Sequence, residues 1–210
     1  MQQEEFFQEH DPEVLAAITG AVVGIAGAGG LGSNAAVALA RAGVGKLIIV
    51  DFDKVSASNL NRQYYFSDQI GLYKVEALKH NLKRVNPWSE YEIYTCRLTP
   101  VMIEELFEEV DIMIEAFDQA ELKQMLIETW DESFKDVPLI IGSGIGGIGA
   151  NNKLHETVSG NLYFIGDGET DVEQCSKPLA PRVGAVACMQ ANLALQLLVD
   201  KYKRGQENQR

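Results

Sequence analysis

Hydrophobic residues form two kinds of pattern along the chain, and the two kinds alternate. Short continuous apolar runs indicate buried strands, whereas apolar residues spaced by three or four positions indicate amphipathic helices. The predicted strands are residues 22–26, 47–50, 91–96, 111–116 and 137–141, and the predicted helices are residues 31–42, 73–85, 100–110 and 120–130. This alternation predicts an α/β fold with a doubly wound, mostly parallel sheet.

The pattern changes after residue 142. Two strand-like segments, residues 153–158 and 161–165, are joined by Ser159-Gly160, which predicts an antiparallel hairpin added to the sheet. A polar connection follows, and a long apolar helix is predicted over residues 181–202.

Three glycines follow the first predicted strand with the spacing G-x-G-x-x-G: Gly27, Gly29 and Gly32. A helical run comes next, and the following strand ends at Asp51, nineteen residues after Gly32. Glycines let the backbone approach phosphates, the helix N-terminus offers them N–H groups, and the acid accepts hydrogen bonds from ribose hydroxyls. This order of elements predicts a Rossmann-like nucleotide-binding unit rather than a glycine-rich turn of structural use alone.

At the start of the chain, Asp11 and Pro12 predict a short helix, because aspartate favours the N-cap and proline the first helical position. We expect the residues before it to be loosely held. No internal repeat or linker divides the chain, so we expect a single domain over residues 1–210. Its parts are an N-terminal helix over residues 11–19, a nucleotide-binding core over residues 20–142, and a hairpin, crossover loop and C-terminal helix over residues 143–204.

Charge narrows the class of partner. The chain of 210 residues has a net charge of −12, which argues against nucleic acid or an anionic membrane as its main partner. Between residues 54 and 84, however, six Lys/Arg stand against two acids. Some of these cations fit one helix face, but Arg62 and Lys74 do not. Both follow Asp51, the predicted ribose-binding acid, closely in the sequence. Cations at this position would neutralise the charge of a triphosphate.

Asp118 follows the strand predicted over residues 111–116. Because the carboxyl ends of parallel strands border one crevice, we expect Asp118 to lie near Asp51 and the glycines. A carboxylate that faces a triphosphate suits Mg²⁺, directly or through water. The alternative is an N-cap role, since Gln119-Ala120 opens a helix.

The three cysteines, Cys96, Cys175 and Cys188, have no paired spacing, and no signal peptide is recognised. Both observations predict a reducing cytoplasm. The cysteines also lie too far apart for C-x-x-C pairs, so we predict no structural zinc. The apolar neighbours of Cys188 in the C-terminal helix predict a packed side chain.

The segments GAGGLGS (27–33) and AGVGKLIIVDFDKVSASNLNRQ (42–63), with Lys74 and Asp118, closely resemble the ThiF/MoeB family, relatives of the ubiquitin-activating enzymes. The resemblance implies an ATP-binding sheet that adenylates the C-terminal Gly-Gly carboxylate of a ubiquitin-like carrier and releases pyrophosphate. It also implies roles for single residues: Gly30 as a phosphate contact, Asp51 as the ribose binder, Asn59, Arg62 and Lys74 as polyphosphate contacts, and Asp118 as the Mg²⁺-associated acid.

The chain departs from many members of that family in two ways. They carry two zinc-binding C-x-x-C pairs and an N-terminal arginine that reaches the neighbouring subunit, whereas the first arginine here is Arg41. The chain therefore looks more like a short form of ThiF, with the thiamine sulfur carrier ThiS as substrate, and the resemblance implies a homodimer. Some relatives use a cysteine near the position of Cys175 in covalent carrier or sulfur-transfer chemistry, and others adenylate without one, so a functional and an incidental Cys175 both stay open.

Other functions fit part of the pattern. The substrate could be a MoaD-like carrier, a small molecule or a tRNA, although the negative charge disfavours tRNA. A non-catalytic nucleotide-binding partner subunit would have no need of Arg62, Lys74 and Asp118. A nicotinamide-dependent oxidoreductase shares the glycine loop and Asp51, but it leaves Asn59 and both cations unexplained, and the chain offers no candidate proton donor.

Overall fold

The computed structural model describes residues 2–170 and 177–208. Its centre is a seven-stranded sheet with the order β3-β2-β1-β4-β5-β7-β6. The strands are β1 (Val22–Ala26), β2 (Lys46–Val50), β3 (Glu90–Tyr94), β4 (Ile112–Glu115), β5 (Leu139–Gly142), β6 (His155–Ser159) and β7 (Leu162–Gly166). Neighbouring strands pair in parallel, except that β6 and β7 form an antiparallel hairpin. The predicted fold class, a Rossmann-like sheet with a hairpin extension, is confirmed.

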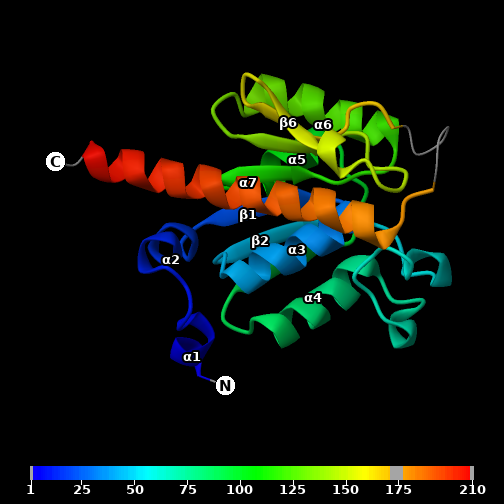
Figure 1. Ribbon diagram of the computed structural model, residues 1–210, viewed down its shortest axis with the longest axis horizontal. Helices are drawn as coiled ribbons and strands as arrows, with labels where there is room; N and C mark the ends of the chain where they lie inside the picture. Colours follow the sequence, from blue (N-terminus) through cyan, green and yellow to red (C-terminus); the bar gives the residue numbers. More distant parts are fainter. Residues whose placement is uncertain (1, 171–176, 209–210) are drawn as a thin grey trace.

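The helices are α1 (Gln3–Phe7), α2 (Pro12–Ile18), α3 (Gly30–Ala42), α4 (Lys74–Val85), α5 (Pro100–Leu106), α6 (Ala120–Ser133) and α7 (Ala180–Glu207). One face of the sheet is covered by α3, α4 and α7, and the other by α5 and α6 (Figure 1). Successive strand residues enter the two cores alternately: Leu47 and Ile49 of β2 join the first, and Ile48 and Val50 join the second. Both faces are covered, which explains why most positions of the central strands are apolar.

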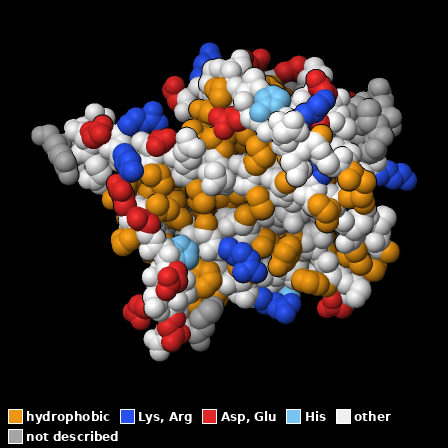
Figure 2. Space-filling model, in the orientation of Figure 1, with side chains coloured by type: hydrophobic (Ala, Val, Ile, Leu, Met, Phe, Trp, Pro, Cys, Tyr) orange, Lys and Arg blue, Asp and Glu red, His pale blue; other side chains and the backbone are white. Residues whose placement is uncertain are grey.

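The structure corrects one expectation at the N-terminal end. Residues before α2 form a helix of their own, α1, and are not loosely held. The rings of Phe6 and Phe7 pack against Trp88, with ring centroids 5.3 and 6.2 Å away. Acidic side chains of this region gather on the surface over α1 and α2 (Figure 2). The aromatic contacts join residues far apart in the chain, so no local pattern could indicate them.

The C-terminal helix corrects a second expectation. Cys188 in α7 is exposed, so the prediction that it is packed is wrong. The buried side of α7 includes Val183, Val186, Ala187 and Gln190, and the burial of a helix residue follows this helical spacing rather than its neighbours in sequence. By length and composition α7 could cross a membrane, but core helices of globular proteins pass the same test. In this fold α7 packs along α3 and α2.

The topology sets the position of the site. Strand β1 lies between β2 and β4, where the strand order changes direction. Loops that leave such neighbouring strands diverge, and they open a crevice at the carboxyl ends. The glycine loop follows β1, Asp51 follows β2 and Asp118 follows β4. The predicted site residues therefore meet at one edge of the sheet.

Candidate nucleotide-binding site

A cavity of about 950 Å³ opens at this edge of the sheet. This volume lies near the upper end of the range for small-molecule sites, roughly 300–1,000 Å³. The cavity wall is built from the glycine loop, the loops after β2, β4 and β5, and the start of α4; it includes Gly29, Asp51, Arg62, Lys74, Asp118 and Gly142. One cavity thus unites the glycines, the predicted ribose acid and the two predicted cations.

The glycines of the loop serve different steric needs. Gly27 has a φ of +101°, a conformation that favours glycine. A Cβ on Gly32 would lie 1.9 Å from the carbonyl oxygen of Gly27, and one on Gly30 would lie 2.9 Å from Val183 Cγ1. At Gly29 the nearest atom would be 3.8 Å away, so the fold itself does not require glycine there. Because Gly29 lines the cavity, its open side is available to a ligand.

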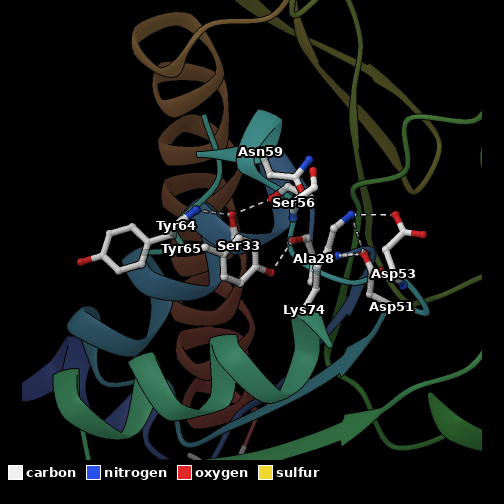
Figure 3. A network of polar contacts seen from close by, with 10 residues as sticks. Ala28, Ser33, Asp51, Asp53, Ser56, Asn59, Tyr64, Tyr65 and Lys74 are labelled. Atoms are coloured by element: carbon white, nitrogen blue, oxygen red, sulfur yellow. Dashed lines mark hydrogen bonds and ion pairs between the residues drawn. The ribbon is translucent and has the colours of Figure 1, made fainter. Parts of the chain in front are cut away.

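Both polar groups of Ala28, in the middle of the glycine loop, are held by side chains (Figure 3). The Ala28 N–H donates to Asp51 Oδ2 at 2.7 Å, and the Ala28 carbonyl oxygen accepts a hydrogen bond from the Tyr65 hydroxyl at 2.6 Å. The Ser33 hydroxyl donates to the carbonyl oxygen of Gly29 at 2.6 Å. These bonds fix the loop at the N-terminus of α3, where amide N–H groups have no partner within the helix.

Asp51 is buried at the end of β2. One carboxylate oxygen binds Ala28, and the other accepts a hydrogen bond from the Asp53 amide at 2.7 Å. Burial raises the pKa of Asp51, against the opposing effects of the Lys74 charge and the two amide donors. An ionised carboxylate has about four acceptor positions, so Asp51 can also accept hydrogen bonds from a ligand.

Lys74 begins α4, and its side chain is buried between two acids. Its ammonium Nζ lies 2.7 Å from Asp53 Oδ2 and 4.0 Å from Asp51 Oδ2. A cation at the N-terminus of a helix opposes the helix dipole, and the two carboxylates offset that cost. The ammonium group has three donors, and Lys74 lines the cavity, where it can meet a phosphate.

The two predicted contacts from the loop after β2 differ in placement. Arg62 is half-buried and lines the cavity, where its guanidinium donates to Asn61 Oδ1 at 2.8 Å. Asn59 is not part of the cavity wall; its side-chain oxygen accepts a hydrogen bond from the Ser56 amide at 3.0 Å and closes a tight turn. Asn61 and Ser58 line the cavity instead. Motif spacing could not show which asparagine of the loop faces the cavity.

Asp118 is exposed at the cavity wall. The N-cap of α6 is Gln119 rather than Asp118, and no side chain caps this helix end, so the capping alternative fails. The residues that the structure describes contain no group of three His, Cys, Asp or Glu that could hold a metal by themselves. Cys175 lies outside the described residues.

An ion pair that was not predicted from the sequence lies at the end of β4, with Glu115 buried and Lys123 partly exposed. Glu115 at the end of β4 is fully buried, and its Oε2 lies 2.5 Å from Lys123 Nζ. Lys123 also donates to the carbonyl oxygen of Gly142 at 2.7 Å, and it lines the cavity. Burial raises the pKa of Glu115, and Lys123 opposes that shift. A glutamate inside an apolar strand, followed eight residues later by a lysine, was the available signal.

A buried ion pair joins the start of α7 to the residue after β7. Arg182 in the first turn of α7 lies 2.5 Å from Asp167 and donates to the carbonyl oxygen of Gly149 at 2.7 Å. Burial by itself would raise the pKa of Asp167. Hydrogen bonds from the Thr170 hydroxyl, the Thr170 amide and the Glu169 amide, together with the charge of Arg182, have the larger effect. They lower the pKa of Asp167 to about 2. Arg182 thus connects α7 both to Asp167 after β7 and to the glycine-rich segment after β5.

Comparisons with known proteins give the following matches. A family model described as "ThiF family" matches residues 2–210. Ubiquitin-like modifier-activating enzyme 5 of Xenopus laevis is 31% identical over 180 residues, which are 80% of this chain and 42% of that protein. The chain therefore spans about two fifths of the length of the curated relatives it matches.

Two solved E. coli proteins have a similar fold. TcdA, a tRNA N6-threonylcarbamoyladenosine dehydratase, solved in complex with AMP, superposes with a TM-score of 0.83 at 23% identity, covering 95% of this chain and 94% of that chain. Its complex with ATP gives a TM-score of 0.80 at 22% identity, with the same coverage of 95% and 94%. MccB with AMPCPP and MccA gives 0.70 at 21% identity, covering 90% of this chain and 58% of that one. Identities this low show a common fold.

Proposed function

The chain belongs to the ThiF family, and on this premise we propose that it is an ATP-dependent adenylyltransferase that activates the C-terminal glycine carboxylate of a ubiquitin-like sulfur carrier protein. We propose a ThiS-like carrier, which would assign the enzyme to thiamine biosynthesis. The observation that carries the proposal is the single cavity that joins the glycine loop, Asp51, Arg62 and Lys74. The TcdA complexes with ATP and AMP, solved on the same fold, support a nucleotide in that cavity.

In the proposed reaction, a carboxylate oxygen of the last glycine forms a bond to the α-phosphorus of ATP. The bond from this phosphorus to the oxygen that bridges to the β-phosphate breaks, and pyrophosphate leaves with the electron pair. The products are the acyl-adenylate of the carrier and pyrophosphate. A C-terminal carboxylate is already ionised at neutral pH, so no general base is needed. The protein contributes positioning and charge stabilisation.

The cavity residues have different proposed roles in this reaction. Asp51 is proposed to accept hydrogen bonds from the ribose hydroxyls with the acceptor positions that Ala28 and Asp53 leave free. Arg62 and Lys74 are proposed to stabilise the charge that develops on the leaving pyrophosphate. Lys74 would then exchange one anionic partner, Asp53, for another, and its charge would never be left unpaired in a buried position.

Asp118 is the proposed acid for Mg²⁺. In nucleotide sites this ion is held by one or two carboxylates together with phosphate oxygens and water. A single exposed carboxylate at the cavity wall fits that arrangement. When bound, the ion supplies positive charge to the phosphate oxygens. We expect no stoichiometric zinc, because zinc sites need four ligands at close spacing.

The carrier tail is proposed to follow the segment after β5. Gly142, Ser143 and Gly144 line the cavity, and an extended Gly-Gly end is proposed to run along their backbone. Lys123, beside Gly142, offers a cation near the proposed path of the terminal carboxylate. A homodimer in the cytoplasm is the proposed setting, and Cys175 is proposed to act after adenylation.

Chemistry on tRNA is the second candidate. The likeness to TcdA covers both chains almost completely, whereas the match to ubiquitin-like modifier-activating enzyme 5 covers 42% of that protein. The net charge of −12 opposes it, because binding to a polyanion depends on clustered positive charge. We therefore propose a carrier protein, rather than tRNA, as the substrate.

Exchange of labelled pyrophosphate into ATP tests the proposal. The assay compares a ThiS-type carrier that ends in Gly-Gly, the same carrier without its last glycine, a MoaD-type carrier, and bulk tRNA. We expect exchange only with intact carriers and fastest exchange with the ThiS type. Activity with tRNA alone would replace the proposal by the second candidate. ATP binding without exchange under any condition would instead indicate a non-catalytic subunit.

A further inference from the structure

Tyr65 is a buried tyrosine to which the proposed reaction assigns no role. Its side chain lies in the core on the α3 side of the sheet, and its hydroxyl donates to the carbonyl oxygen of Ala28 at 2.6 Å. Ala28 is fully buried and is not part of the cavity wall, whereas Gly27 and Gly29 on either side line the cavity. Figure 3 shows the ring of Tyr65 directed toward Ala28, while the ring of the adjacent Tyr64 points away from it.

The bond from the Tyr65 hydroxyl holds the carbonyl end of the peptide group between Ala28 and Gly29. The peptide between Ala28 and Gly29 can rotate as a unit, and glycine tolerates the backbone angles that such a flip requires. A Cβ at Gly29 would have no neighbour closer than 3.8 Å, so the side-chain position of Gly29 is open. A flip exchanges the positions of the Ala28 carbonyl oxygen and the Gly29 N–H. It would turn a partial negative charge toward bound phosphates.

The segment that carries Tyr65 is itself rigidly placed. The Tyr64 amide donates to Ser33 Oγ of α3 at 2.9 Å, and Asn81 of α4 donates to the Tyr64 carbonyl oxygen at 3.0 Å. The pKa of Tyr65 is raised well above its usual value by burial and by the charges of Asp51 and Asp53. The hydroxyl therefore keeps its proton, and remains a donor, throughout the neutral and mildly alkaline range.

We infer that Tyr65 is a positioning residue that locks the Ala28–Gly29 peptide in the orientation that receives the phosphates of ATP. The inference rests on the proposed ATP binding at this cavity. Without the lock, only the fraction of molecules with the correct peptide orientation binds, and the apparent dissociation constant rises by the inverse of that fraction. Chemistry in the bound complex is unchanged, because ATP selects the correct orientation.

Substitution Tyr65→Phe removes the hydroxyl and keeps the ring. The chain offers two matched controls. Tyr91 is also buried, and its hydroxyl donates to the carbonyl oxygen of Asn86 at 2.9 Å, outside the cavity wall. Tyr91→Phe therefore removes the same kind of bond elsewhere in the core. Tyr64→Phe removes a hydroxyl from the neighbouring position, whose ring points away from Ala28.

We expect Tyr65→Phe to raise the calorimetric Kd for ATP by about five- to fifty-fold, the scale of one buried hydrogen bond. The KM for ATP in pyrophosphate exchange should rise by the same factor, with kcat at saturating ATP unchanged, at every pH between about 6 and 9. Tyr91→Phe should lower the melting temperature without changing either constant, and Tyr64→Phe should change none of these. An unchanged Kd in Tyr65→Phe, or an equal rise in Tyr91→Phe, would overturn the inference.

Nuclear magnetic resonance of the protein without ATP separates this inference from the proposed function. We expect the Gly29 amide signal to be single in the wild type and in Tyr91→Phe, and doubled or broadened in Tyr65→Phe. A single sharp signal in Tyr65→Phe would overturn the lock even if ATP binds. If the wild type does not bind ATP, the proposed function fails, and this signal still decides the lock. If Tyr65→Phe does not fold, the wild-type Tyr65 hydroxyl proton becomes the readout: slow exchange supports the lock, and fast exchange contradicts it.

Discussion

Replacement of Asp51 by asparagine tests the ribose assignment and separates it from the structural work of the same side chain. In the fold, each carboxylate oxygen accepts one backbone N–H, from Ala28 and from Asp53, both at 2.7 Å. The amide of asparagine has one oxygen, so one of these two donors loses its partner, at about 1.5–3 kcal/mol for a bond to a charged group. Burial raises the pKa of Asp51, so the charged form is disfavoured in the fold, and its removal returns part of that energy. We expect a net loss of about 1–2 kcal/mol in the free energy of unfolding.

The effect on ATP is separate from this loss. A ribose hydroxyl bound to a buried carboxylate contributes about 1–3 kcal/mol, so Asp51→Asn should raise the calorimetric Kd for ATP by about 5- to 150-fold. Asp111→Asn is the matched control. Asp111 accepts the backbone N–H of Val22 at 2.8 Å at the opposite end of β1, so its loss should lower stability and leave the Kd for ATP unchanged. An Asp51→Asn protein that binds ATP as the wild type does would refute the ribose assignment.

Three further predictions concern the proposed metal ligand Asp118, the stability of the protein at low pH, and Cys175. Asp118→Ala should slow carrier-dependent pyrophosphate exchange by about 10²-fold, the scale of one preorganised electrostatic contact; near-native exchange would remove Asp118 from the metal role. The pKa of Asp167 is lowered to about 2 in the folded protein, so its ionised carboxylate adds about 2 kcal/mol to the free energy of unfolding above the ordinary aspartate pKa. This contribution is lost as the pH falls through about 4 to 2. Urea unfolding across this range should show that decline in the wild type and a flatter profile in Asp167→Asn; identical profiles would contradict the lowered pKa of Asp167. Cys175→Ser should leave pyrophosphate exchange intact and reduce thiocarboxylate formation on the carrier, and equal yields would remove Cys175 from the chemistry.

The features that could be predicted from the sequence are those encoded by local spacing. Gly27 and Gly32 are close in the chain; the positive φ of Gly27 favours glycine there, and the Gly27 carbonyl leaves no space for a Cβ at Gly32, so the motif itself reports the geometry. The order of strands and helices determined the sheet edge at which Asp51 and Asp118 meet. Continuous apolar runs identified strands buried on both faces.

The features that could not be predicted depend on contacts between distant segments. The packing of Phe6 and Phe7 on Trp88 orders α1, and nothing in the local pattern indicates it. The exposure of Cys188 depends on which side of α7 meets α3. The bond between Tyr65 and Ala28 joins residues 37 positions apart and involves a side chain outside the recognised motif.

Detection of the carrier acyl-adenylate by intact-mass spectrometry tests the adenylation proposal most directly. The enzyme, ATP, Mg²⁺ and a ThiS-type carrier are mixed and quenched in acid. We expect a carrier species heavier by one AMP group, with equimolar pyrophosphate, that is absent when the last glycine is removed and absent with Lys74→Ala. Consumption of ATP without this species, or its formation on a carrier that lacks Gly-Gly, would contradict adenylation of the carrier carboxylate.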